Sequence, residues 1–176
     1  SSRVSPQIAY KAQFHDQERA LAALKMLSSD DFAGRKTGTE GNRKAMEWIE
    51  SQLRDRAVMP ATKEGYRAPF TAPNFRSPEE IIEGINLVAA ISGTENPKTA
   101  IIMSGHYDHL GADDGIYNGA DDNASGVSAL LEAISWFQAN PPKNTIIFAF
   151  FDAEEQGIVG SASMVDQFST TEKENI

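Results

Sequence analysis

Acidic side chains gather in one stretch of the sequence that contains no lysine or arginine. Residues 101–126 read IIMSGHYDHLGADDGIYNGADDNASG, and between His106 and Asn123 they hold five aspartates, two histidines and no lysine or arginine. Like charges at this spacing repel one another, and a bound cation would offset the repulsion. Because the chain has no cysteine, histidine and carboxylate must hold any such metal, which favours a catalytic over a closed structural site.

A second acidic group follows further along the chain, at Asp152-Ala153-Glu154-Glu155. An ordinary solvated turn is one interpretation of Glu154 and Glu155. Paired carboxylates also allow a division of labour, in which one ligates a metal and its neighbour moves protons. The spacing of an EF-hand is absent, and a histidine ligand favours zinc or a similar transition metal over calcium.

Two features of the first stretch suit a metal site, although each has a plainer interpretation. A metal-ligating imidazole usually donates its other N–H to a carboxylate, which Asp108 can supply to His106; the alternative is a loop histidine beside an aspartate. Asp121, Asp122 or Asn123 could simply cap a helix. A cap needs one short polar residue, however, and a helix N-terminus also keeps a ligating carboxylate ionised.

The elements around these groups are predicted to bring them together. Residues 99–105 and 145–151 are apolar runs typical of buried strands, and 123–139 has the apolar spacing of a helix. Strand, helix and strand in this order form a crossover with parallel strands, whose carboxyl ends meet at one edge of the sheet. Since 99–105 is apolar on consecutive residues, we expect that strand to be covered on both faces.

The rest of the chain is predicted to be scaffold. Helices are expected at 14–28, 38–55 and 158–168, a further strand at 84–92, and a Pro-rich edge strand or irregular segment at 57–80. Thr37-Gly38-Thr39-Glu40 has the pattern of a capping box at the start of the second helix. These elements predict one α/β domain of catalytic type over residues 1–176, a three-layer sandwich with a mostly parallel, mixed central sheet flanked by helices.

Composition argues against nucleic acid as a partner and against a membrane-spanning segment. The 16 basic and 25 acidic residues give a formal net charge of −9, which argues against nucleic acid because phosphate binding needs a basic surface. No apolar run is long enough to span a bilayer. Composition indicates neither the compartment nor the oligomeric state.

Four motifs carry a family resemblance. GHYDHLG at 105–111, GADDNASG at 119–126, AEEQG at 153–157 and GRKTGTEGN at 34–42 resemble those of the dizinc aminopeptidases of bacterial leucine-aminopeptidase type. These are zinc exopeptidases related to glutaminyl cyclases and glutamate carboxypeptidases. The resemblance runs from about residue 30 to residue 168.

The resemblance implies a role for five residues of this sequence. It implies that His106 ligates one zinc ion and that Asp108 orients it. It further implies that Asp122 bridges two zinc ions, that Glu155 ligates the second ion, and that Glu154 is the general base.

Other consequences of the resemblance concern neighbouring residues. The Asp122–Asn123 peptide bond is expected to be cis, and no ligand role is carried over to Asp121 or His109. The family has a further Asp and His after the Glu-Glu pair, whereas no histidine follows Glu155 here. We therefore expect the N-terminal portion of a longer peptidase domain, incomplete at its C-terminus and inactive on its own.

The resemblance implies a zinc-dependent aminopeptidase that hydrolyses N-terminal residues from peptides with a free N-terminus, using a metal-activated water. A secreted or periplasmic location is expected on the same ground. Two alternatives stay open. One is a non-catalytic interaction module, as in transferrin-receptor ectodomains, and the other is a single-zinc glutaminyl cyclase.

Overall fold

A central sheet lies between helices on both of its faces. The computed structural model describes residues 16–75 and 77–174. The strands are β1 (Met59–Pro60), β2 (Arg67–Pro73), β3 (Ile81–Ile91), β4 (Asn96–His106) and β5 (Asn144–Phe151). The helices are α1 (Gln17–Leu27), α2 (Glu40–Asp55), α3 (Ser125–Ala139) and α4 (Val159–Glu174), with a 3-10 helix η1 (Asp30–Arg35) and a single π-helical turn η2 (Ala120–Ala124). None of the helices in the described ranges is long and apolar enough to cross a membrane.

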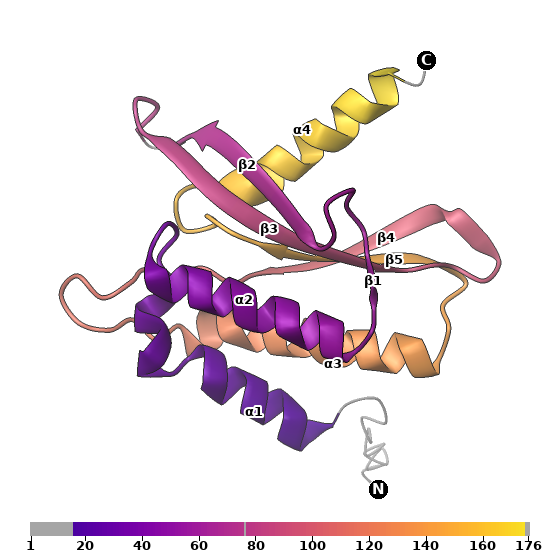
Figure 1. The fold of residues 1–176 in the computed structure, drawn as a ribbon, viewed down its shortest axis with the longest axis horizontal. Coiled ribbons are helices and arrows are strands. Elements are labelled where there is room, and N and C mark those ends of the chain that lie inside the picture. Colours follow the sequence, from indigo (N-terminus) through magenta and orange to yellow (C-terminus); the bar gives the residue numbers. More distant parts are fainter. Residues whose placement is uncertain (1–15, 76, 175–176) are drawn as a thin grey trace, which may run out of the picture.

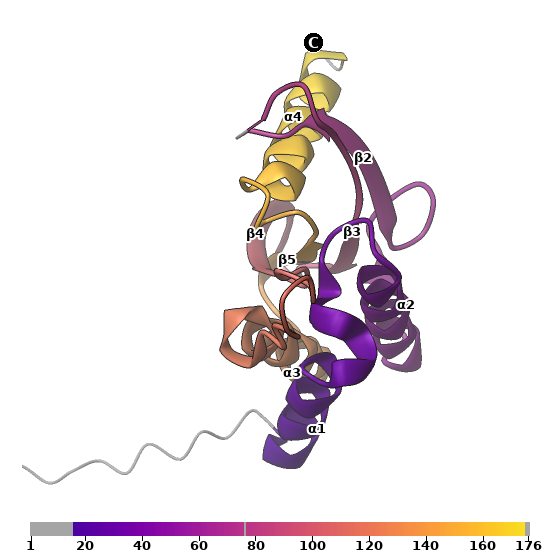
Figure 2. The same cartoon turned by 90° about the vertical axis from the view of Figure 1, so that its left-hand side faces the viewer.

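The layers confirm the predicted three-layer α/β sandwich. Helices α2 and α3 cover one face of the sheet with α1 packed beneath them, and α4 lies on the opposite face (Figures 1 and 2). Alternate residues of β5 explain this arrangement, because successive strand side chains point to opposite faces. Phe148 and Phe150 belong to the large core under α2 and α3, whereas Ala149 packs in a smaller cluster with Met164 of α4.

Strand pairing corrects one part of the prediction. The order is β1-β3-β5-β4, with β2 also paired to β3. Only β4 and β5 are parallel, while the β1–β3, β2–β3 and β3–β5 pairs are antiparallel. The expectation of a mostly parallel sheet is therefore wrong for the described strands. The reason is that α3 makes the single parallel crossover, whereas the Pro-rich segment before β3 folds back on it as an antiparallel edge strand.

A second correction concerns β4, which was expected to be covered on both faces. Ile101 is 53% exposed and Ile102 is 50% exposed. Among the described strands β4 pairs with β5 alone, so it lies at the edge of the sheet. It is buried only at its carboxyl end, at Gly105 and His106. Consecutive apolar residues show that a strand is suited to burial, but they do not supply the elements that would bury it.

The start of α2 also differs from the predicted capping box. Thr39, not Thr37, is the N-cap, and its hydroxyl accepts a hydrogen bond from the Asn42 backbone N–H at 3.3 Å. The hydroxyl of Thr37 instead donates to the carboxylate of Asp152 at 2.9 Å. Thr37 thus links the approach to α2 with the end of β5.

Candidate metal centre

The register of the two parallel strands brings the acidic groups together. His106 at the end of β4 lies opposite Phe151 at the end of β5. The residue after β4 continues the contact with the same partner, since the Tyr107 N–H donates to the Phe151 carbonyl at 2.9 Å. The turn that carries Glu154 and Glu155 therefore starts beside His106, at the carboxyl edge of the sheet, where open α/β sheets bind ligands.

Three predicted ligands form one cluster. His106, Asp122 and Glu155 each offer an atom, and these atoms lie within 4.8 Å of one another. His106 Nε2 lies 2.9 Å from Asp122 Oδ1. One imidazole nitrogen and two carboxylate oxygens are a donor set that zinc accepts. The described residues therefore fit a zinc ion by both chemistry and spacing.

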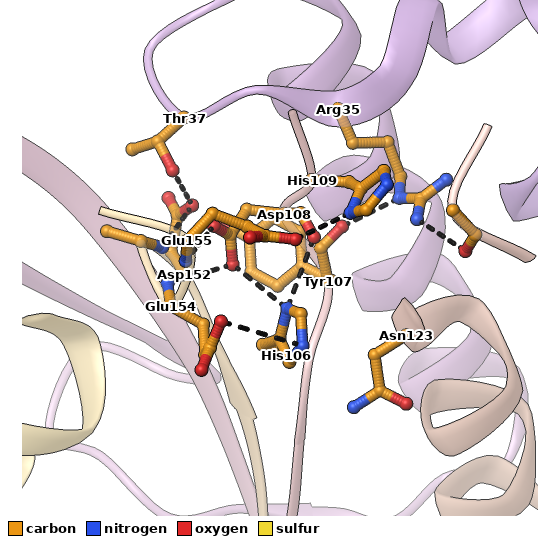
Figure 3. Close-up of polar contacts among 12 residues, drawn as sticks. Arg35, Thr37, His106, Tyr107, Asp108, His109, Asn123, Asp152, Glu154 and Glu155 are labelled. Atoms are coloured by element: carbon orange, nitrogen blue, oxygen red, sulfur yellow. Dashed lines mark hydrogen bonds and ion pairs between the residues drawn. The ribbon is translucent and has the colours of Figure 1, made fainter. Parts of the chain in front are cut away.

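Glu154 faces the same space without joining the cluster. Its Oε2 lies 3.9 Å from His106 Nε2, and its side chain is 39% exposed (Figure 3). Glu154 and Glu155 line an open cleft of about 790 Å³, whose other walls include Phe75, Ile158 and Val165. The Glu154 carboxylate is thus accessible from the cleft while it remains close to the cluster.

Asp108 connects the two halves of the centre. Its buried carboxylate accepts hydrogen bonds from the backbone N–H groups of Glu154 at 3.1 Å and of Glu155 at 3.2 Å. His106 Nδ1 lies 3.2 Å from the Asp108 carbonyl oxygen and 3.5 Å from its carboxylate. Asp108 therefore fixes the imidazole on one side and the Glu154–Glu155 turn on the other.

The surrounding carboxylates control the charge of His106. Burial lowers the pKa of His106, but the hydrogen bond and charge of Asp108, with the charges of Glu154 and Asp122, outweigh burial and raise it from 6.5 to about 9. A metal ligand must be neutral imidazole. A metal that binds here at neutral pH must therefore displace a proton from His106.

Asp122 lies at an irregular turn that begins the crossover helix. The peptide bond between Asp122 and Asn123 is cis, as the resemblance implied. The side-chain oxygen of Asn123 accepts a hydrogen bond from the Gly126 backbone N–H at 3.0 Å. Among the three polar residues considered as caps, Asn123 thus makes the cap-like contact, and the carboxylate of Asp122 is left to face His106.

Arg35 is a residue of this centre for which sequence reasoning found no role. It is 1% exposed. Its guanidinium donates to four backbone carbonyl groups, those of Tyr107 at 2.8 Å, Asn118 at 2.8 Å, Gly119 at 3.0 Å and Leu27. Burial lowers the pKa of Arg35, while the charges of Asp108 and Asp122 act in the opposite direction. Arg35 therefore ties the loop after His106 to the loop before Asp122.

Asp152 is a second residue that sequence reasoning left without a role. It is 1% exposed, and burial raises its pKa although several hydrogen bonds oppose the shift. Its carboxylate accepts from Thr37 Oγ1 at 2.9 Å, Asn42 Nδ2 at 3.0 Å, Ile85 N at 3.2 Å and Ala153 N at 2.9 Å. These contacts fasten the start of the Glu154–Glu155 turn to α2 and β3.

Two glycines allow the loops to approach closely beside the centre. The Gly111 N–H donates to the Gly34 carbonyl at 2.9 Å. A Cβ atom at Gly34 would lie 2.1 Å from the Gly111 oxygen, and both residues have positive φ, 68° and 92° respectively. Only the match to the motif GRKTGTEGN could have drawn attention to Arg35 and Gly34 in the sequence. Their partners here are backbone groups of distant loops, which leave no recognisable pattern of side chains.

His109 also lies in the centre, although no ligand role was assigned to it. Its Nδ1 is 2.6 Å from Glu155 Oε1 (Figure 3). The first and fourth residues of the HYDH sequence thus face the cluster, and the third binds the backbone of the opposing turn.

Comparison with known proteins places this centre in a family. The sequence profile described as "Peptidase family M28" matches residues 86–176, more than half of the chain. The chain belongs to peptidase family M28. A "Probable zinc metalloprotease" of Pyricularia oryzae is 34% identical over 139 residues, which are 74% of this chain and 27% of that protein. Zinc is therefore the metal that this M28 chain's relatives imply, in agreement with the donor set.

Solved structures show the same fold. LapB from Legionella pneumophila is 25% identical with a TM-score of 0.65, and the match covers 91% of this chain and 41% of that one. A leucine aminopeptidase precursor from Bacteroides thetaiotaomicron is 21% identical with a TM-score of 0.66, covering 82% and 49%. A glutaminyl cyclase from Porphyromonas gingivalis is 21% identical with a TM-score of 0.64, covering 81% and 47%. The M28 chain spans about a quarter to a half of these relatives.

Proposed function

We propose that this chain carries the metal centre and the general base of a zinc aminopeptidase that removes N-terminal residues from peptides with a free N-terminus. The observation that supports the proposal is the cluster of His106, Asp122 and Glu155, with ligand atoms within 4.8 Å of one another. Family membership supports a zinc peptidase. We further propose aminopeptidase specificity and a secreted or periplasmic location, both on the basis of the family resemblance.

Two zinc ions are proposed, held by three described residues. His106 and Asp122 would hold one ion, and Asp122 and Glu155 the other. When bound, zinc polarises a carbonyl and lowers the pKa of a coordinated water. Catalytic zinc commonly has three protein ligands, so each ion needs one more than the described residues supply. For this reason we propose that residues 1–176 belong to one domain and are inactive on their own.

Glu154 is proposed to move the proton. Its carboxylate lies 3.9 Å from His106 Nε2, is reached from the cleft, and is held in place through its backbone by Asp108. In peptide hydrolysis a positioned carboxylate accepts a proton from the attacking water and then delivers it to the leaving amine. Glu155, its neighbour, is less exposed at 20% and is tied to His109, which suits a ligand.

The test is Glu154→Gln in the product of the complete gene, with zinc measured by elemental analysis. We expect unchanged zinc content and a loss of about 10²-fold or more in the hydrolysis of aminoacyl arylamides, because a general base contributes roughly 10²–10⁴-fold. Glu95→Gln is the matched control, since Glu95 is an exposed acid paired with Lys143. Near-normal activity of the Glu154→Gln variant with zinc present would remove the assignment of the base.

The same preparation separates the alternatives. Cyclisation of N-terminal glutamine by the unsubstituted protein, without arylamide hydrolysis, would indicate a glutaminyl cyclase. Bound zinc without either activity would indicate a non-catalytic module.

A further inference from the structure

We propose that His109 is a positioning residue, which holds the Glu155 carboxylate in the orientation that binds metal. The inference rests on the proposed function, since it concerns the same centre. It goes beyond the ligands and the base because it assigns a role to the second histidine of the HYDH sequence.

The contact between the two side chains is short and largely screened from solvent. His109 Nδ1 lies 2.6 Å from Glu155 Oε1, and the side chains are 11% and 20% exposed. Hydrogen bonds to a carboxylate are stronger than neutral ones, and the low exposure of this pair reduces competition from water. Within the described residues, His109 is the hydrogen-bond partner of the Glu155 carboxylate.

His109 is itself held from two sides. Its backbone N–H donates to the Arg35 carbonyl at 3.2 Å. Its ring lies directly against Gly119, because a Cβ atom at that glycine would come within 2.6 Å of His109 Cδ2. In Figure 3 the ring of His109 lies between Arg35 and Glu155. A residue fixed in this way can orient a flexible partner.

Glu155 needs such a partner. Its backbone N–H is fixed by Asp108 at 3.2 Å, but its side chain still has three rotatable bonds before the carboxylate. A hydrogen bond from His109 to one oxygen removes most of that freedom and leaves the second oxygen for a metal. Carboxylate ligands are generally hydrogen-bonded in this manner, and the loss of such a partner typically weakens metal binding by about 10–100-fold.

A direct ligand role for His109 is the main rival, and the geometry favours positioning. The cluster with ligand atoms within 4.8 Å of one another contains His106, Asp122 and Glu155, and His109 is not a member. The nitrogen that His109 directs at the centre is the one in contact with Glu155. It therefore acts on the centre through Glu155.

The experiment compares His109→Leu with His109→Asn in the product of the complete gene. Leucine removes the donor but keeps bulk, whereas the amide nitrogen of asparagine can take the place of Nδ1. Zinc affinity is measured by chelator competition, the coordination by the visible spectrum of the cobalt(II)-substituted protein, and folding by thermal unfolding of the metal-free protein. If leucine prevents folding, His109→Ala replaces it, because alanine has no hydrogen-bond donor and adds no volume.

For the leucine variant we expect zinc affinity to fall by about 10–100-fold with an altered cobalt spectrum, and for the asparagine variant values close to those of the unsubstituted protein. Equal affinity and an unchanged spectrum in the leucine variant would overturn the inference. The inference would also be overturned if both His109 variants lost one metal ion completely, as we expect for Glu155→Ala. That result would identify His109 as a metal ligand. A failure of the proposed function is distinct, since the unsubstituted protein would then lack arylamide hydrolysis, whatever the zinc affinities of the His109 variants.

Discussion

The carboxylate of Asp108 is hydrogen-bonded to the backbone N–H of Glu155 at 3.2 Å, although the two are 47 positions apart in sequence. The adjacent N–H of Glu154 donates to the same carboxylate at 3.1 Å. A single buried acid therefore sets how far the proposed base and the proposed ligand lie from His106. This link between two loops determines the geometry of the centre as much as the proposed ligands do.

Replacing Asp108 with alanine should weaken zinc binding without abolishing it. Both backbone N–H groups would lose their acceptor and His106 its neighbouring carboxylate, so we expect zinc affinity to fall by about 10–100-fold. Chelator competition measures the change. The control is Asp113→Ala, on the same loop, where the side chain is 80% exposed and pairs with Lys36. If Asp108→Ala and Asp113→Ala bind zinc equally well, Asp108 does not organise the centre.

Replacing Arg35 with methionine should destabilise the chain strongly. The four carbonyl groups that Arg35 binds would lose their donor, and each unsatisfied buried group costs about 1–3 kcal/mol. We expect the free energy of unfolding in urea to fall by at least about 3 kcal/mol, with an intermediate loss for Arg35→Lys. Arg43→Met, at an exposed site on α2, should change it little. If Arg35→Met and Arg43→Met had similar midpoints of urea unfolding, Arg35 would not stabilise the loops through these carbonyl groups.

Replacing Glu50 with glutamine should change the acid dependence of stability. Burial raises the pKa of Glu50, but hydrogen bonds from Arg67 at 2.7 Å and Arg54 at 2.5 Å outweigh it, so the pKa is lowered from 4.5. Because the folded pKa lies below the unfolded one, ionised Glu50 stabilises the fold above about pH 4.5, and this contribution disappears as pH falls through the folded value.

We therefore expect Glu50→Gln to lose roughly 1–2 kcal/mol at pH 7 and to show a shallower decline of stability between about pH 5 and pH 3. Urea unfolding across this range provides the measurement. Glu47→Gln is the comparison, because Glu47 makes an exposed ion pair with Arg43 in the same helix and such pairs contribute little. Parallel pH curves for the unsubstituted chain and Glu50→Gln would refute the prediction.

The exposed edge of the sheet predicts self-association of the isolated chain. Ile101 and Ile102 are about half exposed, point to opposite faces, and lie on a strand that pairs with β5 alone among the described strands. Unpaired apolar edges are sites of strand pairing between molecules. Sedimentation velocity of residues 1–176 should show oligomers that Ile102→Lys reduces. Leu21→Lys, on the surface of α1, should leave the oligomers unchanged. If the two substitutions had equal effects, the edge strand β4 would not be the site of association.

Sequence patterns were enough to predict those parts of the centre that depend on the order of strands and helices along the chain. The apolar runs before His106 and Asp152 and the helical spacing between them predict a parallel crossover, which the structure contains, and parallel strands bring their carboxyl ends to one edge. The layered α/β fold followed from the same periodicity. Neither conclusion required knowledge of contacts between distant side chains.

Features that depend on distant contacts were not predictable in this way. Arg35 and Asp152 bind backbone groups in segments far from them in the sequence, so no spacing rule identifies them. His109 contacts Glu155 across 46 positions of sequence, from a loop whose backbone is hydrogen-bonded to Arg35. The antiparallel majority in the sheet arises from β3, whose direction relative to β5 is not encoded in the apolar pattern of either strand.

The contact between Gly34 and Gly111 has a consequence for engineering this scaffold. A side chain at residue 34 would meet the Gly111 oxygen at 2.1 Å and would force apart the two loops that Arg35 and His109 connect. A saturation library should therefore find position 34 as intolerant as the proposed metal ligands, although the residue contributes no functional group. Variants aimed at new substrates should spare both glycines and diversify the walls of the open cleft instead.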